Sequence, residues 1–454
     1  MVALIVLFLS GLISLFLAFA KKPWMVLSTA IAGLVAGGIS LFTEYHYGYQ
    51  LVGYEGLKFD QFAVFYGLIG ILFTLLIILS GYSSFKQNLN HTGDYIALLL
   101  FSLTGALCML AFTDMFMFFL GLEILSIPIY VMAGSKKEDN RSTEAALKYF
   151  LTGSFATGIL LFGIAWIYGG TGSFRLDEIQ TFIESNANHQ PMVYLGLLFL
   201  LAAFLFKVGA APFHFWSPDV YDGSPSIVTG YMAAVVKLGA FGAFMKIFGM
   251  TFGGLHDFWA PAMMGLAMLT MFVGNLSALR QNRFKRLLAY SSITHVGYAL
   301  LTLIVQSDES AFNLWAYLFS YGFSTIALIT VALIVNDSED RIESFRGLIR
   351  RNPFTGFVAI LALLSLAGVP PLMGFFGKYL VFAEAISSQP LLVVIAIINS
   401  GIGIYYYLRV VILMLQKQDA NAPQTPRHSV PALQFVVLIV CAIALMFGGN
   451  MLIF

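Results

Sequence analysis

Four lysines and one glutamate occupy positions where the surrounding sequence is apolar enough to lie in a lipid bilayer. The lysines are Lys148, Lys207, Lys237 and Lys378, and the glutamate is Glu123. A charge near the bilayer centre costs roughly 2.5–3.5 kcal/mol on insertion scales, so such residues face the protein interior, find partners and usually mark ion paths. Because burial shifts the pKa of lysine readily, we interpret these residues as groups that take up and release protons.

Polar side chains near these charges recur at the three- and four-residue spacing of a helix, which aligns them on single faces. Such faces can hold a file of waters that relays protons. Alternatively, serine and threonine on membrane helices only pack closely or bond across helices. The aligned sets are Glu123, Ser126 and Tyr130; Glu144, Lys148 and Thr152; Ser291, His295, Tyr298 and Thr302; and Asn313, Tyr317, Ser320 and Ser324.

Glu123 has no charged partner on its own helix, and we expect its partner to be Lys148 on the adjacent one. Such a pair would stabilise the ammonium, and its loss would lower the pKa of the lysine and release the proton. The pair would therefore act as a switch. Glu144, one turn before Lys148, offers that lysine a local partner instead.

Two further groups of polar residues have interpretations in which structure weighs at least as much as proton transfer. His214 follows a helix break, where capping or repair of the backbone is as plausible as proton transfer. Tyr405, Tyr406 and Tyr407 are consecutive and cannot share one helix face, so we interpret them mainly as packing residues.

The composition indicates a membrane protein that is helical throughout. The chain is 59% hydrophobic and only 10% charged. Apolar runs of about 20 residues recur from end to end, enough to cross roughly 30 Å of hydrocarbon as helices. The net charge of +1 gives no reason to expect nucleic acid. Cys108 and Cys441 lie in apolar runs without metal or disulfide spacing, so no metal site is predicted.

We predict an all-α polytopic fold of about fourteen transmembrane helices, two of them broken. The breaks fall at Ala211-Pro212 in the seventh span and at Gly368-Val369-Pro370-Pro371 in the twelfth. The expected spans are 2–20, 24–42, 61–80, 95–112, 114–134, 143–168, 192–222, 226–249, 259–279, 287–304, 311–335, 353–388, 390–416 and 430–453.

The basic residues predict the orientation of these spans. Loops after even-numbered spans hold only Lys58, Arg175 and Lys246. By the positive-inside rule the odd loops are cytoplasmic, and both termini lie on the periplasmic side. Of the 24 lysines and arginines, 16 lie in loops after odd-numbered spans, namely Lys21, Lys22, Lys86, Lys136, Lys137, Arg141, Arg280, Arg283, Lys285, Arg286, Arg341, Arg346, Arg350, Arg351, Lys417 and Arg427.

The two breaks resemble each other and lie five spans apart, which predicts two inverted five-helix repeats. Each break is an apolar run followed by glycine, proline and aromatic residues. The repeat makes the helix of Glu123 correspond to that of His295. We therefore divide the chain into 1–94, a three-helix segment; 95–249, the first repeat; 259–416, the second repeat; and 430–453, a last helix.

Four motifs of this chain resemble the antiporter-like membrane subunits of respiratory complex I and of multisubunit cation/proton antiporters. The match extends over essentially the whole chain. The motifs are Thr113-Asp114 through Gly121-Leu122-Glu123-Ile124-Leu125-Ser126, Ala145-Ala146-Leu147-Lys148-Tyr149-Phe150, Phe206-Lys207-Val208-Gly209-Ala210-Ala211-Pro212 through Tyr221, and Leu287-Leu288-Ala289-Tyr290-Ser291-Ser292-Ile293. The lysine at 378 and the end of the chain soon after the fourteenth span favour one subclass of these subunits.

The resemblance implies a proton pathway through Glu123, Lys148, Lys207, Lys237, His295 and Lys378, coupled to NADH–quinone oxidoreduction. It implies no cofactor in this chain, and NAD, FMN, iron–sulfur clusters and quinone in partner subunits. The implied partners are other membrane subunits, including sister antiporter-like subunits, in a bacterial inner membrane. The second repeat has only hydroxyls and an amide where the first has Lys148, so the two halves are not chemically equivalent.

Two alternatives make different predictions. A subunit of a sodium/proton antiporter would exchange cations without redox partners. A scaffold whose buried charges only fix helix packing would tolerate Lys237→Met.

Overall fold

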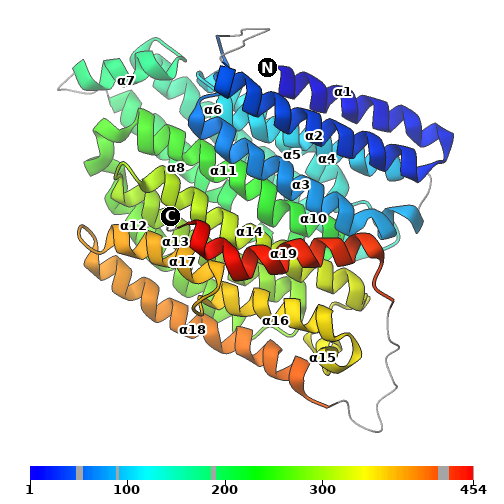
Figure 1. The fold of residues 1–454 in the computed structure, drawn as a ribbon. Helices are drawn as coiled ribbons and strands as arrows, with labels where there is room; N and C mark the ends of the chain where they lie inside the picture. Colours follow the sequence, from blue (N-terminus) through cyan, green and yellow to red (C-terminus); the bar gives the residue numbers. More distant parts are fainter. Residues whose placement is uncertain (48–54, 88–90, 186–190, 418–428, 453–454) are drawn as a thin grey trace.

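The computed structural model describes residues 1–47, 55–87, 91–185, 191–417 and 429–452. Within these ranges the helices form one bundle, with α1 along one edge and α18 along the opposite edge (Figure 1). Arg427, one of the basic residues used above, and Ile453, the end of the last expected span, lie outside the described residues.

The described elements are helices, and apart from them only isolated β-bridges occur in these ranges. Their bounds are α1 Val2–Leu17, η1 Ala18–Ala20, α2 Pro23–Tyr47, α3 Gln61–Gln87, α4 Thr92–Ala111, α5 Met115–Ala133, α6 Asn140–Thr171, α7 Leu176–Ser185, α8 Pro191–Val208, α9 Trp216–Gly223, α10 Ser226–Tyr231, η2 Met232–Val236, α11 Lys237–Phe244, η3 Met245–Thr251, η4 Gly253–Leu255, α12 His256–Ala278, α13 Phe284–Val305, α14 Ser310–Val335, η5 Ile342–Phe345, α15 Leu348–Arg351, α16 Pro353–Ala367, α17 Met373–Ala385, α18 Pro390–Leu415 and α19 Ala432–Met451.

The expected membrane fold is confirmed. In the described part of the chain, 13 helices are long and apolar enough to cross a membrane. The remaining expected span, 353–388, is divided into α16 and α17, each too short to be counted by itself. The predicted break in the seventh span is also present, between α8 and α9.

Some predicted boundaries were wrong, and one surface helix was missed. Helices α2 and α3 continue past the predicted ends at 42 and 80, because polar residues extend a helix whose apolar part ends earlier. At the extended end of α2, Glu44 accepts a hydrogen bond of 2.9 Å from the amino group of Met1. Helix α7 is a short amphipathic helix that buries Leu176, Ile179 and Ile183.

The two helix breaks have the same local geometry. Gly209 and Gly368 adopt left-handed backbone angles, with φ of 78° and 84°. After each glycine, the next amide bonds a carbonyl five residues earlier: Ala210 to Leu205 at 2.8 Å, and Val369 to Leu364 at 3.0 Å. This is the Schellman pattern of a helix end, which favours glycine because a Cβ is strained at this angle.

The span Ser226–Thr251 contains two π-helical turns, which the sequence did not predict. They flank α11, whose first residue is Lys237. A π turn inserts an extra residue into the helix and rotates the residues after it, so these turns contribute to the direction in which Lys237 points.

The most deeply buried candidate spans are Ser226–Thr251, α13 and α14. Helix α14 contacts α3, α13, α16, α17 and α19, which places it near the centre of the bundle. These three spans carry Lys237, His295 and Tyr317, so these three residues lie in the core rather than at its lipid-facing edge.

Loops on the same predicted side of the membrane contact one another. Arg283, after the ninth span, pairs with Asp222, after the seventh, at 2.8 Å. Arg141, after the fifth, donates to the carbonyl of Ser338, after the eleventh. We name this end of the bundle, formed by the loops after odd-numbered spans, the basic face. The division of the chain at 1–94, 95–249, 259–416 and 430–453 stays a prediction.

Candidate functional site

Lys237 lies at the centre of a buried polar group between α11, α13 and α14. Its Nζ donates to the carbonyl of Ser292 at 3.1 Å and also contacts the hydroxyl of Ser292. The same Nζ lies 5.1 Å from the centre of the Tyr321 ring, whose electron-rich face attracts a cation. Because no acidic side chain forms an ion pair with Lys237 in the described residues, its charge is stabilised by neutral groups alone.

His295 links this group to the next helices. Its Nδ1 is hydrogen-bonded to the hydroxyl of Tyr317 at 2.6 Å, and its Nε2 to the hydroxyl of Tyr407 at 3.2 Å. Tyr407 is bonded in turn to Ser291. Each of these groups can both give and accept a proton, so the chain from Ser291 to Tyr317 can pass a proton through the imidazole.

Lys378 lies on α17, just after the helix break. We name Lys237, His295, Lys378 and the side chains bonded to them the polar line. Lys378 Nζ donates to the carbonyl of Ala367 at 3.1 Å and to the hydroxyl of Ser400 at 2.9 Å. The Ala367 carbonyl is at the end of α16, where the break removes its helical partner. The ammonium also lies 5.2 Å from the centre of the Tyr298 ring.

Two narrow cavities lie among these groups. One is lined by His295, Tyr317, Tyr321, Ser324 and Lys378, among others. Each cavity has about 10 Å³ accessible to the centre of a water molecule, which is about the room needed for one water. The second shares Tyr321 and Leu366 with the first and extends to Tyr221, Thr229, Ser291 and Thr325. Single waters in these spaces would connect the side chains from Thr229 to Lys378.

Glu123 and Lys207 form a separate polar group between α5, α6 and α8. Lys207 Nζ donates to the hydroxyl of Ser126, and Glu123 accepts a 2.8 Å hydrogen bond from Thr157. Lys207, Thr157 and Tyr130 line a third cavity of the same small size. The predicted face of Glu123, Ser126 and Tyr130 therefore meets Lys207 across this space.

The expected pairing of Glu123 with Lys148 was wrong. Lys148 pairs with Glu144 and with Asp219, each at 2.6 Å, so the local alternative is present and a second partner was missed. Glu123 is level with Thr157, nine residues beyond Lys148 on α6. That separation corresponds to about 13 Å along the helix axis, which is too far for an ion pair.

The structure adds polar residues to those that the sequence identified. Tyr407 was interpreted as a packing residue, but its hydroxyl joins His295 to Ser291. Glu384 accepts hydrogen bonds from Ser307 at 2.6 Å and Asn313 at 2.8 Å, at the end of α17 remote from the basic face. The sequence also missed Tyr321 and Ser292, although their positions gave a partial signal. Tyr321 is four residues after Tyr317, and Ser292 is next to Ser291.

The structure gives no group of three or more metal-ligating side chains within the described ranges. The two cysteines are buried and separate. The groups that the structure brings together here are lysine, imidazole and hydroxyl groups, which can bind and pass protons.

The model of the family described as "NADH:quinone oxidoreductase/Mrp antiporter, TM" matches residues 113–403. The chain is 37% identical to NADH-quinone oxidoreductase subunit N of Cytophaga hutchinsonii, over 98% of this chain and 97% of that protein. It is 36% identical to subunit N of Flavobacterium psychrophilum, over 92% of each chain. Both relatives are subunit N, and they confirm that this is the subclass that Lys378 favoured.

Solved structures share the fold. A chain of respiratory complex I from Thermus thermophilus with bound aureothin is 31% identical, with a TM-score of 0.84 over 98% of this chain and 96% of that one. A chain of the Mrp complex from Dietzia is 19% identical, with a TM-score of 0.85 over 100% of this chain and 96% of that one. The second likeness supports the fold alone.

Proposed function

Because this chain belongs to the NADH:quinone oxidoreductase/Mrp antiporter family of membrane subunits, we propose that it performs the activity of that family and that the polar line of this chain carries the protons. The chain is a proton-translocating membrane subunit of NADH–quinone oxidoreductase. NAD, FMN, iron–sulfur clusters and quinone would be bound by partner subunits, which carry out the electron transfer. The membrane is the bacterial inner membrane, with the basic face in the cytoplasm and both termini on the periplasmic side.

The proton route begins at the basic face and ends near Glu384. It passes the cavity beside Thr229, then Lys237, His295 and Lys378. The observation that supports this order is the contact between Lys237 and Tyr321, because Tyr321 lines both cavities of the line. Beyond Lys378, Glu384 lies on the same helix α17, at the end remote from the basic face. Its carboxylate can release protons to that side of the membrane.

Lys207 and Glu123 act as a second store of charge beside this route. The Thr157 hydroxyl holds Glu123 at the cavity that Lys207 lines, so movement of a proton on or off Lys207 changes the field at that carboxylate. Lys148 has a different role, because its pairing with Asp219 connects α6 to the second half of the broken helix, α9.

A partner membrane subunit covers the outer face of α6. Lys148 and Glu144 remain 40% and 59% exposed there, although Leu147, Phe150 and Leu151 are exposed on the same helix. A charged pair facing lipid is costly, whereas a partner's polar side chains could pair with it. This placement agrees with a sister antiporter-like subunit as the neighbour.

A comparison of two single variants, Lys237→Met and Lys246→Met, tests the proton route. Both lysines are buried on the same span, but Lys246 donates to the carbonyl of Leu110 and lies 4.0 Å from Asp60, away from the line. In membrane vesicles containing the assembled complex, Lys237→Met should reduce NADH-driven proton uptake at least tenfold, and Lys246→Met should retain most of it.

Normal proton uptake in assembled Lys237→Met complex would contradict the route, and the same result for Glu123→Ala would show that Glu123 does not influence it. Sodium-dependent exchange by the chain without NADH-oxidising partners would instead favour the antiporter alternative.

A further inference from the structure

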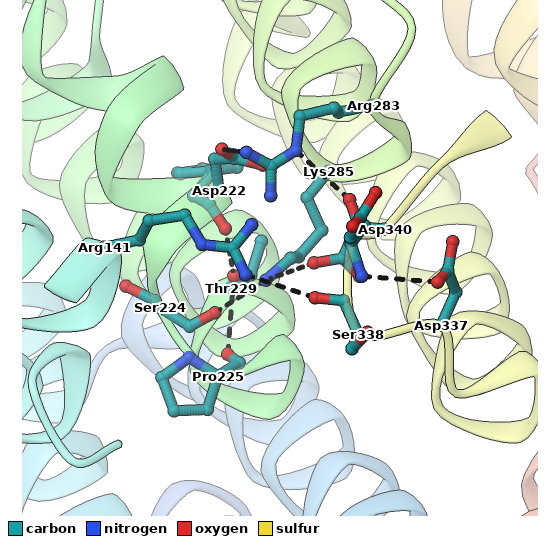
Figure 2. A network of polar contacts seen from close by, with 12 residues as sticks. Arg141, Asp222, Ser224, Pro225, Thr229, Arg283, Lys285, Asp337, Ser338 and Asp340 are labelled. Carbon is teal, nitrogen blue, oxygen red and sulfur yellow. Dashed lines mark hydrogen bonds and ion pairs between the residues drawn. The ribbon is translucent and has the colours of Figure 1, made fainter. Parts of the chain in front are cut away.

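The end of the polar line at the basic face is closed by charged residues from both predicted repeats. The sequence had assigned the two basic residues, Arg283 and Lys285, only to membrane topology, and it had not identified their acidic partners. Asp222 pairs with Arg283 at 2.8 Å, and Lys285 pairs with Asp340 at 2.9 Å. Figure 2 shows these four side chains converging, with Arg141 and Ser338 beside them. We name Asp222, Arg283, Lys285 and Asp340 the ionic cluster.

The ionic cluster is unusually buried for charges at the end of a helical bundle. Lys285 is 2% exposed and Asp222 is 6% exposed. Surface lysines and aspartates normally remain in water, because removing each charge from water costs several kcal/mol. Two acids and two bases in this cluster balance each other, so the sum of charges is zero and the cluster can be buried.

Several polar atoms in the ionic cluster and beside it have no hydrogen-bond partner in the structure. They are Asp222 Oδ1, Ser224 Oγ and Arg283 Nη2. Buried polar groups are normally hydrogen-bonded to protein or ordered water, and a missing partner is costly. Water reaching this point would satisfy them, so the cluster is closed to bulk solvent but built of groups that bind water.

The ionic cluster lies close to the cavity that Thr229 and Tyr321 line, and Tyr321 contacts Lys237. Lys285 Nζ donates to the carbonyl of Ser224 at 2.9 Å. One residue later, the carbonyl of Pro225 accepts from Thr229, whose side chain lines that cavity (Figure 2). The cluster and the cavity are therefore joined by the short stretch of backbone from Ser224 to Thr229.

The second half of the broken helix takes part in this closure. Helix α9 has eight residues, and it is separated from α8 by the break at Gly209. Two carboxylates on α9 pair with two arginines at the start of α13: Asp222 with Arg283, and Asp219 with Arg286 at 3.1 Å. Separating these pairs would remove the ion pairs that join α9 to the second repeat.

We propose that the ionic cluster is a gate that controls water access from the basic face to Lys237. The closed state is the one in the structure, with α9 held against α13. The gate opens when Asp222 separates from Arg283 and Lys285 separates from Asp340. Water then enters between Ser224 and Thr229. Asp219 also holds Lys148, so the gate is in contact with a charged residue of the first repeat. The proposal rests on the proton route given above.

A cysteine reporter below the gate tests this directly. Thr229 is buried beside the cluster, and Thr229→Cys would be introduced into a chain in which Cys108 and Cys441 are replaced by alanine. In vesicles of known orientation that contain the whole complex, a membrane-impermeant maleimide is added from the basic face without NADH. Labelling should be slow with the intact cluster and at least tenfold faster with Asp222→Asn or Asp340→Asn.

Two further variants keep the test specific. Glu343→Gln removes the partner of Arg346, an exposed pair on the same face that lies outside the cluster, and should leave labelling unchanged. Exchanging the charges, with Asp222→Arg and Arg283→Asp together, should restore slow labelling. If Asp222→Asn reduces the amount of assembled complex, Asp340→Asn gives the same comparison from a half-buried loop position.

Equal labelling rates in the intact and the disrupted clusters would overturn the gate, as would faster labelling from the opposite face. Because labelling is measured without NADH, it is independent of proton pumping. Failure of the gate is thus distinguishable from failure of the route through Lys237, which the Lys237→Met variant reports.

Discussion

Removing the hydroxyl of Tyr407 should interrupt proton transfer through His295 while leaving the fold intact. In Tyr407→Phe, the bonds to Ser291 and to His295 Nε2 are lost. Hydrogen bonds within membrane proteins contribute about 0.6 kcal/mol on average and at most about 1.7 kcal/mol, so the stability cost should be roughly 1–3 kcal/mol. The phenylalanine ring keeps the apolar packing of the buried tyrosine.

The expected effect on transport is larger than the effect on stability. Without the hydroxyl, a proton must cross the gap between Ser291 and His295 by recruiting a water, and the adjoining cavity has room for about one. If the barrier to this step rises by about 1.4 kcal/mol, the rate falls roughly tenfold. We expect at least this loss in NADH-driven proton uptake.

Tyr406→Phe is the matched control for this prediction. Tyr406 is equally buried and adjacent, but its hydroxyl donates to Asn275 at 3.0 Å rather than bonding to His295. Both variants lose a buried tyrosine hydroxyl, so both should destabilise the chain slightly. Initial proton uptake in vesicles, normalised to the amount of assembled complex, should fall only for Tyr407→Phe. Equal uptake by the two variants would refute a proton path through Tyr407.

Two other substitutions probe the helix break and the end of the route. Gly368→Ala places a side chain at a φ of 84°, 3.0 Å from Lys378 Cδ, and should cost about 1–2 kcal/mol, seen as a lower midpoint of thermal inactivation. Gly401→Ala, in a helix with nothing within 4 Å of the added Cβ, should not lower that midpoint. Glu384→Gln keeps the shape of the group that accepts from Ser307 and Asn313 but removes its charge, so proton release and uptake rates should fall several-fold. The exposed neighbour Asp308→Asn, with the same loss of charge, should have little effect, and similar rates for both would remove Glu384 from the route.

The sequence predicted the features that depend on local composition. Membrane spans follow from the length of apolar runs, because every residue in a bilayer-crossing helix contributes to its transfer energy. The breaks at Gly209 and Gly368 follow from glycine and proline, whose backbone preferences act within a few residues. The lysines 207, 237 and 378 could be identified as buried because each lies deep inside an apolar run.

The partners of those charges could not be predicted in the same way. Lys148 pairs with Asp219, 71 residues away, and Glu123 with Thr157 on α6, rather than with each other. Glu123 lies beside Thr157, which is nine residues after Lys148 on the same helix. The sequence does not give the offset between two neighbouring helices along their axes. The packing of neighbouring helices sets that offset.

The sequence alone therefore determined that this chain crosses the membrane many times, where its helices break and that Lys207, Lys237 and Lys378 are buried. These properties depend on each residue's own solvation and backbone preference. The tertiary structure alone decided that Tyr407 joins His295, that π turns flank Lys237, and that arginines and lysines needed for topology also close the basic face. Such contacts join residues far apart in the chain, and only the packed bundle brings them within hydrogen-bonding distance.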